Sequence, residues 1–108
     1  MDTLSPALAA LSHPSRRAIL DRLTRGPARV KEIAEPFDMS LNAISKHLKV
    51  LEAAGLISRE VVGREHVIAF KPARLREIST WVAEYERFWT RHLDGLEAHF
   101  KAKRRSIK

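Results

Sequence analysis

The sequence of 108 residues contains no cysteine and only four glycines. The absence of cysteine excludes disulfides, thiolate metal sites, cysteine nucleophiles and thiol redox switches. The four glycines form no loop of the kind that cradles phosphate groups. No apolar run approaches the roughly 18 residues that cross a bilayer, and no basic-then-apolar leader opens the sequence. We therefore expect a cytoplasmic protein with no membrane partner.

The composition is that of one folded domain with a short charged tail. Hydrophobic residues make up 44% of the chain and charged residues 31%, which is enough apolar material for a core. We place this domain at residues 1–100. Residues 101–108 carry five basic residues and no acidic one. We expect them to be a disordered tail, which either attracts phosphates without sequence preference or is simply solvated.

The net charge of +7 is unevenly distributed, and besides the basic tail the middle of the chain is positive. Residues 13–76 carry a net charge of +6, whereas residues 77–100 carry −3. A basic module of this size suits a polyanionic partner such as a nucleic acid. Many basic proteins bind no nucleic acid, so the order of helices and strands has to support this interpretation.

Apolar periodicity and chain breakers predict four helices, a β-hairpin and a long final helix. Ser40 is a favourable N-cap for the fourth helix, and residues 62–65 are a plausible tight turn. Two helices separated by a short turn and followed by a hairpin are typical of a winged helix-turn-helix. The expected helices cover residues 4–11, residues 14 to the Gly26-Pro27 pair, 30–35, 41–54 and 72–100, and the strands cover 56–61 and 66–70.

The helix at residues 41–54 has the two faces that a DNA-reading helix needs. At roughly 100° per residue, one side of it is apolar, with Ile44, Leu48, Leu51 and Leu41. The other side is polar and carries two cations. Asparagine amides pair with adenine, and lysines meet guanine acceptors or phosphates. A solvated helix without a partner has the same two faces. The residues predicted to face the major groove are Asn42, Ser45, Lys46 and Lys49, with His47 and Ser40 near phosphates.

The hairpin is expected to act as a wing that lies beside the DNA backbone or in the minor groove. Arg64, next to Gly63 at the tip, is the preferred contact. Arg59 and His66 are further candidates on the two strands. The alternative for Arg64 is an exposed turn residue without a partner.

Two arginines at the start of the second helix have two open roles. Arg16 and Arg17 either add contacts to the DNA backbone or form ion pairs with Asp21 or Glu52. The sequence is compatible with both.

Three segments resemble the ArsR family of bacterial repressors. Residues 45–57, SKHLKVLEAAGLI, look like the family signature. Residues 13–20, HPSRRAIL, are similar to the upstream helix, and residues 33–40, IAEPFDMS, fit the first helix-turn-helix segment. The likeness extends over about residues 4–100. It implies a homodimer that binds an inverted-repeat operator in double-stranded DNA and represses transcription.

The last helix carries more apolar surface than one small winged domain can cover. Its stripe recurs at spacings of three and four, and Leu4–Leu11 offers a second surplus. A two-fold dimer through Leu4–Leu11 and Trp81–Phe100 would bury both, and the family resemblance implies the same helices. The fold class expected is therefore mainly α with a small β-hairpin, a winged helix-turn-helix with long N- and C-terminal dimerisation helices. The aromatic residues have two other open roles, which are completing the core of the monomer and lining a pocket for an apolar effector.

Family members often sense metals or arsenite, and this sequence lacks the ligands of both family patterns. The thiolate pattern needs cysteines. The pattern on the last helix, Asp-x-His followed by His-x-x-Glu, has its best match at residues 84–86 and 97–100, where both histidine positions are occupied by other residues. His99 is out of register. We therefore expect no metal site and no cofactor.

Catalysis has little support in the sequence. Serines near His13 build no triad by proximity alone, and no oxyanion loop is visible. We therefore expect a dimeric, sequence-specific transcriptional regulator that is not an enzyme. Two other functions stay open. One is a winged-helix module that binds a protein partner, and the other is a repressor gated by an organic ligand or a metal.

Overall fold

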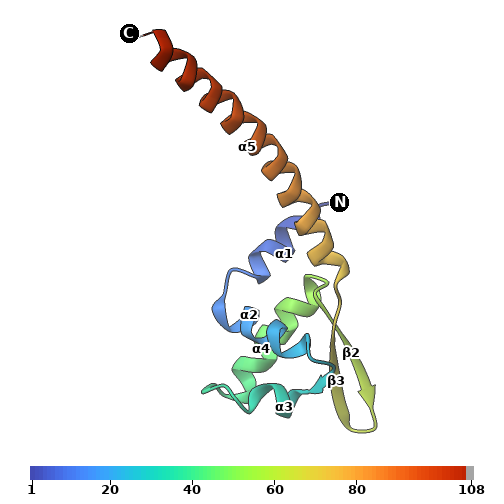
Figure 1. The fold of residues 1–108 in the computed structure, drawn as a ribbon. Coiled ribbons are helices and arrows are strands. Elements are labelled where there is room, and N and C mark those ends of the chain that lie inside the picture. Colours follow the sequence, from blue (N-terminus) through green and yellow to red (C-terminus); the bar gives the residue numbers. More distant parts are fainter. Residues whose placement is uncertain (107–108) are drawn as a thin grey trace. The chain divides into compact units, whose positions relative to one another are not determined.

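The structure is a computed structural model that describes residues 1–106, and side chains through residue 103. It divides into two compact units, one at residues 1–78 and the other from residue 79 onward. Along the chain the elements are α1 (Leu4–Ala10), α2 (Pro14–Leu23), β1 (Ala28–Arg29), α3 (Val30–Ala34), α4 (Leu41–Ala53), β2 (Ile57–Val62), β3 (Glu65–Phe70) and α5 (Ala73–Ser106) (Figure 1). The predicted order of helices and hairpin is confirmed.

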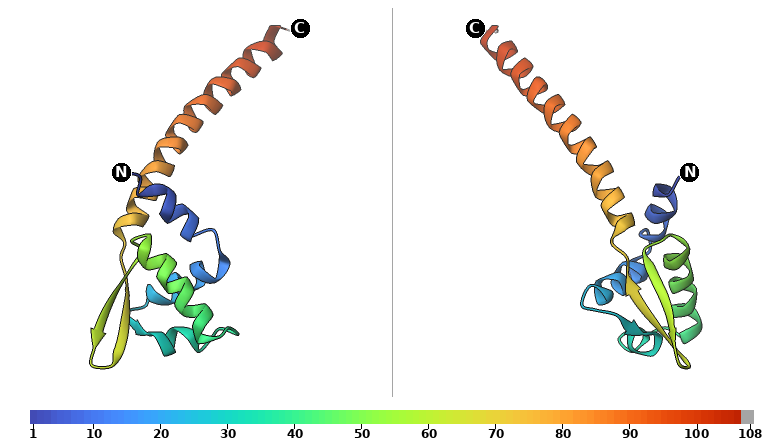
Figure 2. Two further views of the ribbon diagram at one scale, coloured as in Figure 1. Left: turned by 180° about the vertical axis from the view of Figure 1, so that it is seen from behind. Right: turned by 90° about the vertical axis from the view of Figure 1, so that its right-hand side faces the viewer.

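The three strands of the first unit form one antiparallel sheet in the order β1-β3-β2. β2 and β3 are joined by a tight turn in which Gly63 has a φ of +64°, a conformation that glycine adopts without strain. Figure 2 shows this hairpin as a ribbon beside the helices. β1 was not predicted, because a strand of two residues has no alternation to recognise. It pairs Ala28 with Ile68 and Arg29 with Val67 of β3.

The hydrophobic core of the first unit takes large aliphatic residues from nearly every element. Its fully buried side chains include Ile19 of α2, Ile33 of α3, Leu48 of α4 and Ile68 of β3. α4 contributes more of them than any other element, since Ile44, Leu48 and Leu51 have no exposed surface. The core therefore fixes the rotation of α4 about its own axis.

Both ends of α4 are set by local contacts. Ser40 is the N-cap, and its hydroxyl oxygen accepts a hydrogen bond from the amide of Ala43 at 3.1 Å, as predicted. At the other end Gly55 has a φ of +78°, and the amide of Leu56 donates to the carbonyl of Leu51 at 3.0 Å. A glycine in this conformation ends a helix without strain, so the chain turns directly into β2.

The second unit consists of the part of α5 from residue 79 onward. The helix continues through Ser106, six residues past the predicted domain boundary at residue 100, after which a disordered tail was expected. Lysine and arginine are good helix formers, and Lys101 pairs with Glu97 one turn earlier at 3.9 Å. Residues 107–108 of the expected tail lie outside the described residues. Among the helices described, none is both long and apolar enough to span a membrane.

We expect Leu48→Ala to lower the free energy of unfolding by about 2–5 kcal/mol, because it leaves a cavity in the core. Val50→Ala is the matched control on the same helix. Val50 is exposed, so its loss should change stability by no more than about 0.5 kcal/mol. Urea denaturation followed by circular dichroism measures both. Equal effects of the two substitutions would contradict the placement of Leu48 in the core.

Candidate nucleic-acid interface

The solvent-facing side of α4 presents polar side chains without partners. Asn42, Lys46 and Lys49 are exposed, and within the described residues none of these side chains forms a hydrogen bond or an ion pair. Ser45 is half-buried on the same helix. Ser40 is exposed at the helix start, and its hydroxyl oxygen is occupied by the capping bond. Of the predicted residues, Ser40, Asn42, Lys46 and Lys49 are therefore exposed, and Ser45 is partly covered.

The hairpin carries one arginine at its tip and a second that forms an ion pair with α4. Arg64 is exposed in the turn after Gly63, and the part of the chain that the structure describes offers it no ion pair. Arg59 on β2 instead lies 3.4 Å from the carboxylate of Glu52 on α4. Arg64 thus remains available to a ligand, whereas Arg59 links the wing to the last turns of α4.

His47 belongs to a cluster between α2 and α4. Its ring lies 4.6 Å from that of His13, centroid to centroid, and its Nδ1 is 3.4 Å from a guanidinium nitrogen of Arg16. Burial lowers the pKa of His47 below its usual value, and the charges of His13 and Arg16 lower it further. His47 is therefore half-buried on the flank of α4, with one ring nitrogen directed at Arg16.

Arg16 and Arg17 form neither of the ion pairs that the sequence left open. The Nε of Arg16 donates to the carbonyl of Ala10 at 2.6 Å, and Arg17 donates to the carbonyl of Leu11 at 2.6 Å. Glu52 pairs with Arg59 instead. The ion-pair hypothesis was wrong because the nearby carbonyls at the end of α1 are unsatisfied acceptors, which attract cations. Both arginines join the end of α1 to the start of α2.

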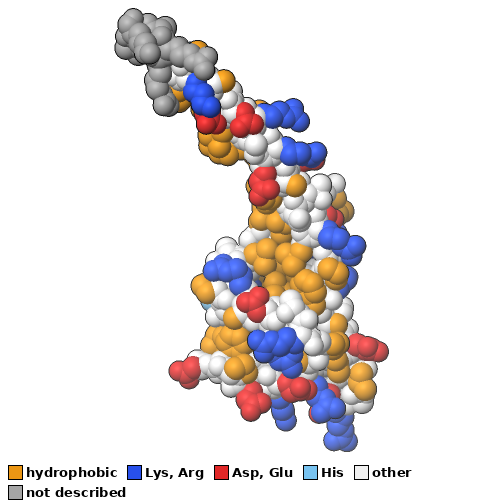
Figure 3. All heavy atoms as spheres, viewed as in Figure 1, with side chains coloured by type: hydrophobic (Ala, Val, Ile, Leu, Met, Phe, Trp, Pro, Cys, Tyr) orange, Lys and Arg blue, Asp and Glu red, His pale blue; other side chains and the backbone are white. Residues whose placement is uncertain are grey.

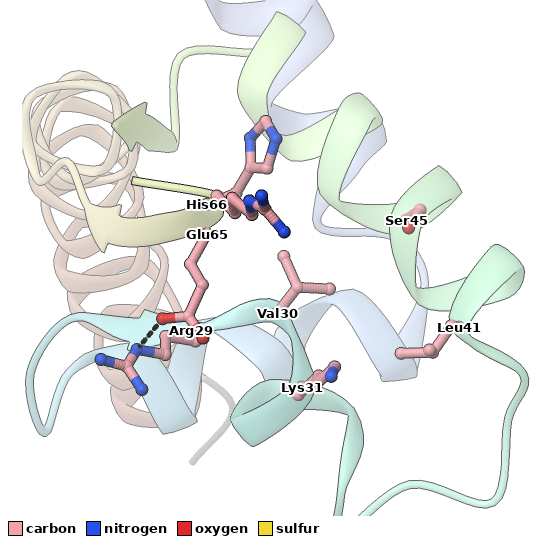
Figure 4. A pocket seen from close by; sticks show the side chains of 8 residues that line it. Arg29, Val30, Lys31, Leu41, Ser45, Glu65 and His66 are labelled. Carbon is pink, nitrogen blue, oxygen red and sulfur yellow. Dashed lines mark ion pairs between the residues drawn. The ribbon is translucent and has the colours of Figure 1, made fainter. Parts of the chain in front are cut away.

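An open groove of about 420 Å³ separates α4 from the start of β3. Figure 4 shows Leu41 and Ser45 on α4 at one side, Glu65 and His66 on β3 at the other, and Val30 between them. Arg29, Lys31 and Arg64 complete the lining. Sequence reasoning missed Arg29 and Lys31, because only the pairing of β1 with β3 brings them to this surface. No local pattern in the sequence signals that pairing.

The described residues include no group of three or more histidine, cysteine, aspartate or glutamate side chains that could hold a metal ion.

In the second unit, apolar side chains of α5 are exposed, and some are visible in Figure 3 between charged ones. The exposed fractions in this stripe start at 39% for Trp81 and reach 66% for Phe88. The aromatic residues of α5 are therefore not buried within the second unit itself.

Comparison with known proteins gives consistent matches. A family model described as a helix-turn-helix domain matches residues 11–60. The chain is 40% identical over 89 residues to the HTH-type transcriptional regulator Rv2034 of Mycobacterium tuberculosis, covering 82% of this chain and 80% of the relative. It is 34% identical to the transcriptional repressor SdpR of Bacillus subtilis, covering 70% and 84%. The crystal structure of an ArsR family transcriptional regulator superposes with a TM-score of 0.79 at 39% identity, covering 82% of this chain and 98% of that one.

The lowered pKa of His47 predicts a loss of stability in acid. Unfolding returns this pKa towards its usual 6.5, so the unfolded chain binds the proton more tightly than the folded one. The stability that neutral His47 provides is present above pH 6.5 and is lost as the pH falls below it. We expect the free energy of unfolding to fall less between neutral and mildly acidic pH in His47→Gln than in the wild type. Urea denaturation at a series of pH values measures this.

His66→Gln is the control for this experiment, because His66 is exposed. Its stability should follow the wild type across the same pH range. A His47→Gln variant whose stability falls as steeply with pH as the wild type would contradict the prediction.

Proposed function

Because this chain belongs to the ArsR family of winged helix-turn-helix transcriptional regulators, we propose that it represses transcription as a homodimer bound to an inverted-repeat operator in double-stranded DNA. One observation carries the proposal. Ile44, Leu48 and Leu51 at the back of α4 are fully buried. Asn42, Lys46 and Lys49 on its front are exposed, and none of them has a partner among the described residues. A relative named as a transcriptional repressor supports the direction of the regulation.

Each side chain of the candidate interface has a role in this proposal. Asn42, Ser45, Lys46 and Lys49 face base edges or nearby phosphates in the major groove. Ser40 and the half-buried His47 contact phosphates at the flank of α4. Arg64 is the contact of the wing, where an arginine meets the backbone or the narrow minor groove.

The proposed dimer is supported by apolar surface that one chain leaves uncovered. Trp89 on α5 is 58% exposed, and Leu93, Leu96 and Phe100 follow it along the same stripe. Leu11, which follows α1, packs against the core. On α1 itself Leu4 is half-buried and Leu8 is exposed. A two-fold axis would pair each stripe with its copy. It would also present two α4 helices about one turn of DNA apart.

We expect Lys46→Ala to weaken binding of the operator by about 1–3 kcal/mol, because it removes a base-edge or phosphate contact in the major groove. Fluorescence anisotropy with the duplex upstream of the protein's own gene, beside a scrambled duplex, measures the change. Lys71→Ala is the matched control, since Lys71 is an exposed lysine that follows β3. Unchanged affinity of Lys46→Ala would remove this residue from the interface. Equal and weak binding of both duplexes by the wild type would contradict sequence-specific binding to that site.

We expect Trp89→Glu to shift the protein from dimer to monomer, because it places a charge in an apolar interface. Thr90→Glu introduces the same charge one residue further along α5 and away from the stripe, so it should remain dimeric. Sedimentation velocity reports the mass of each variant. A Trp89→Glu protein that stays dimeric would place the interface elsewhere.

A further inference from the structure

The groove between α4 and the wing is lined by side chains from four separate parts of the chain. Arg29 ends β1, Lys31 lies on α3, Ser45 lies on α4, and Arg64 belongs to the wing turn. The groove therefore includes Ser45 of α4 and Arg64 at the tip of the wing. It joins the two elements that we propose to contact DNA.

The charge of this groove is predominantly positive. Lys31 and Arg64 are exposed, and among the described residues neither takes part in an ion pair. Arg29 is held by the one acid of the groove, since its Nε lies 2.6 Å from the carboxylate of Glu65 (Figure 4). Both of these side chains remain more than half exposed. The groove thus presents two unneutralised cations, and Glu65 moderates a third.

The groove also contains apolar surface. Leu41 was expected on the apolar side of α4, but it lies in the first turn of the helix, outside the core, and is 52% exposed. Val30 lies half-buried between the two walls. Apolar contacts with these side chains would not strengthen the binding of a small inorganic anion. A chain that alternates charged and apolar groups would use both kinds of surface, and the sugar–phosphate backbone of DNA is such a chain.

The position of the groove favours DNA over an acidic peptide. The major and minor grooves of a duplex are separated by the sugar–phosphate backbone. If α4 enters the major groove and the wing reaches the adjacent minor groove, one strand has to pass between them. The groove lies at that place, and its charge is complementary to that of the strand.

We propose that this groove seats one sugar–phosphate strand of the bound DNA, with Lys31 and Arg64 against its phosphates, Val30 and Leu41 against its sugars, and Glu65 as a repulsive charge at its edge. This inference rests on the proposed DNA-binding function and deepens it. It adds Lys31 as a phosphate contact that strengthens DNA binding, and it assigns Glu65 a repulsive contact that weakens DNA binding.

The test compares substitutions of opposite charge in the groove. Binding of the upstream duplex and of a scrambled duplex is measured by fluorescence anisotropy between about 50 and 200 mM salt. Lys31→Gln should weaken binding of both duplexes and reduce the salt slope by about one unit, because one phosphate contact is lost. Glu65→Gln keeps an acceptor for Arg29 but removes the negative charge. It should tighten the binding of both duplexes severalfold at low salt.

Lys71→Gln is the charge-matched control for Lys31→Gln, and its salt slope should equal that of the wild type. Circular dichroism confirms that each variant is folded. If the wild type binds both duplexes but Lys31→Gln keeps the full salt slope, or Glu65→Gln fails to bind more tightly, the proposed seat for the strand is overturned while DNA binding stands. If the wild type binds no duplex and Lys31→Gln instead loses binding to poly-glutamate, both proposals fail in favour of an acidic protein partner.

Discussion

The burial of one side of α4 is the constraint on which the remaining structure depends. Ile44, Leu48 and Leu51 are fully enclosed, and α1, α2, α3 and β2 all pack against this helix. Since apolar burial of this extent is the main driving force for folding, α4 cannot rotate without opening the core. The polar side chains on its front are therefore held outward, with no partner of their own among the described residues. The same interaction that stabilises the domain also presents its candidate interface.

The order of elements and the two faces of α4 could be predicted because their signals are local. The cap at Ser40 and the glycine of the wing turn are decided by neighbouring residues, and the apolar back of α4 follows from helical periodicity alone. The placement of the candidate site was predictable to the same extent. Asn42, Lys46 and Lys49 were expected on the exposed face, and they lie there.

The parts that could not be predicted depend on contacts between distant residues. β1 is a strand only because β3 pairs with it, and Arg29 meets Glu65 only through that pairing. Arg59 was expected as a wing cation, but Glu52 is within reach once the hairpin folds back beside α4. His47 was expected to face a phosphate, and its contact with His13 depends on how α2 packs. No periodicity or motif encodes these pairs, because each joins charges or rings whose spacing is set by tertiary packing.

Two ion pairs hold the wing along both of its strands, Arg59 of β2 to α4 and Glu65 of β3 to β1. Surface ion pairs of this kind add little to the free energy of unfolding, and the main restraint on the wing is the backbone pairing of β3 with both β1 and β2. The wing has therefore lost much of its conformational freedom before any ligand arrives. The entropic cost of ordering the wing is then included in the free energy of folding, and it is not lost again when a ligand binds. Preorganisation of this kind strengthens binding without adding a contact.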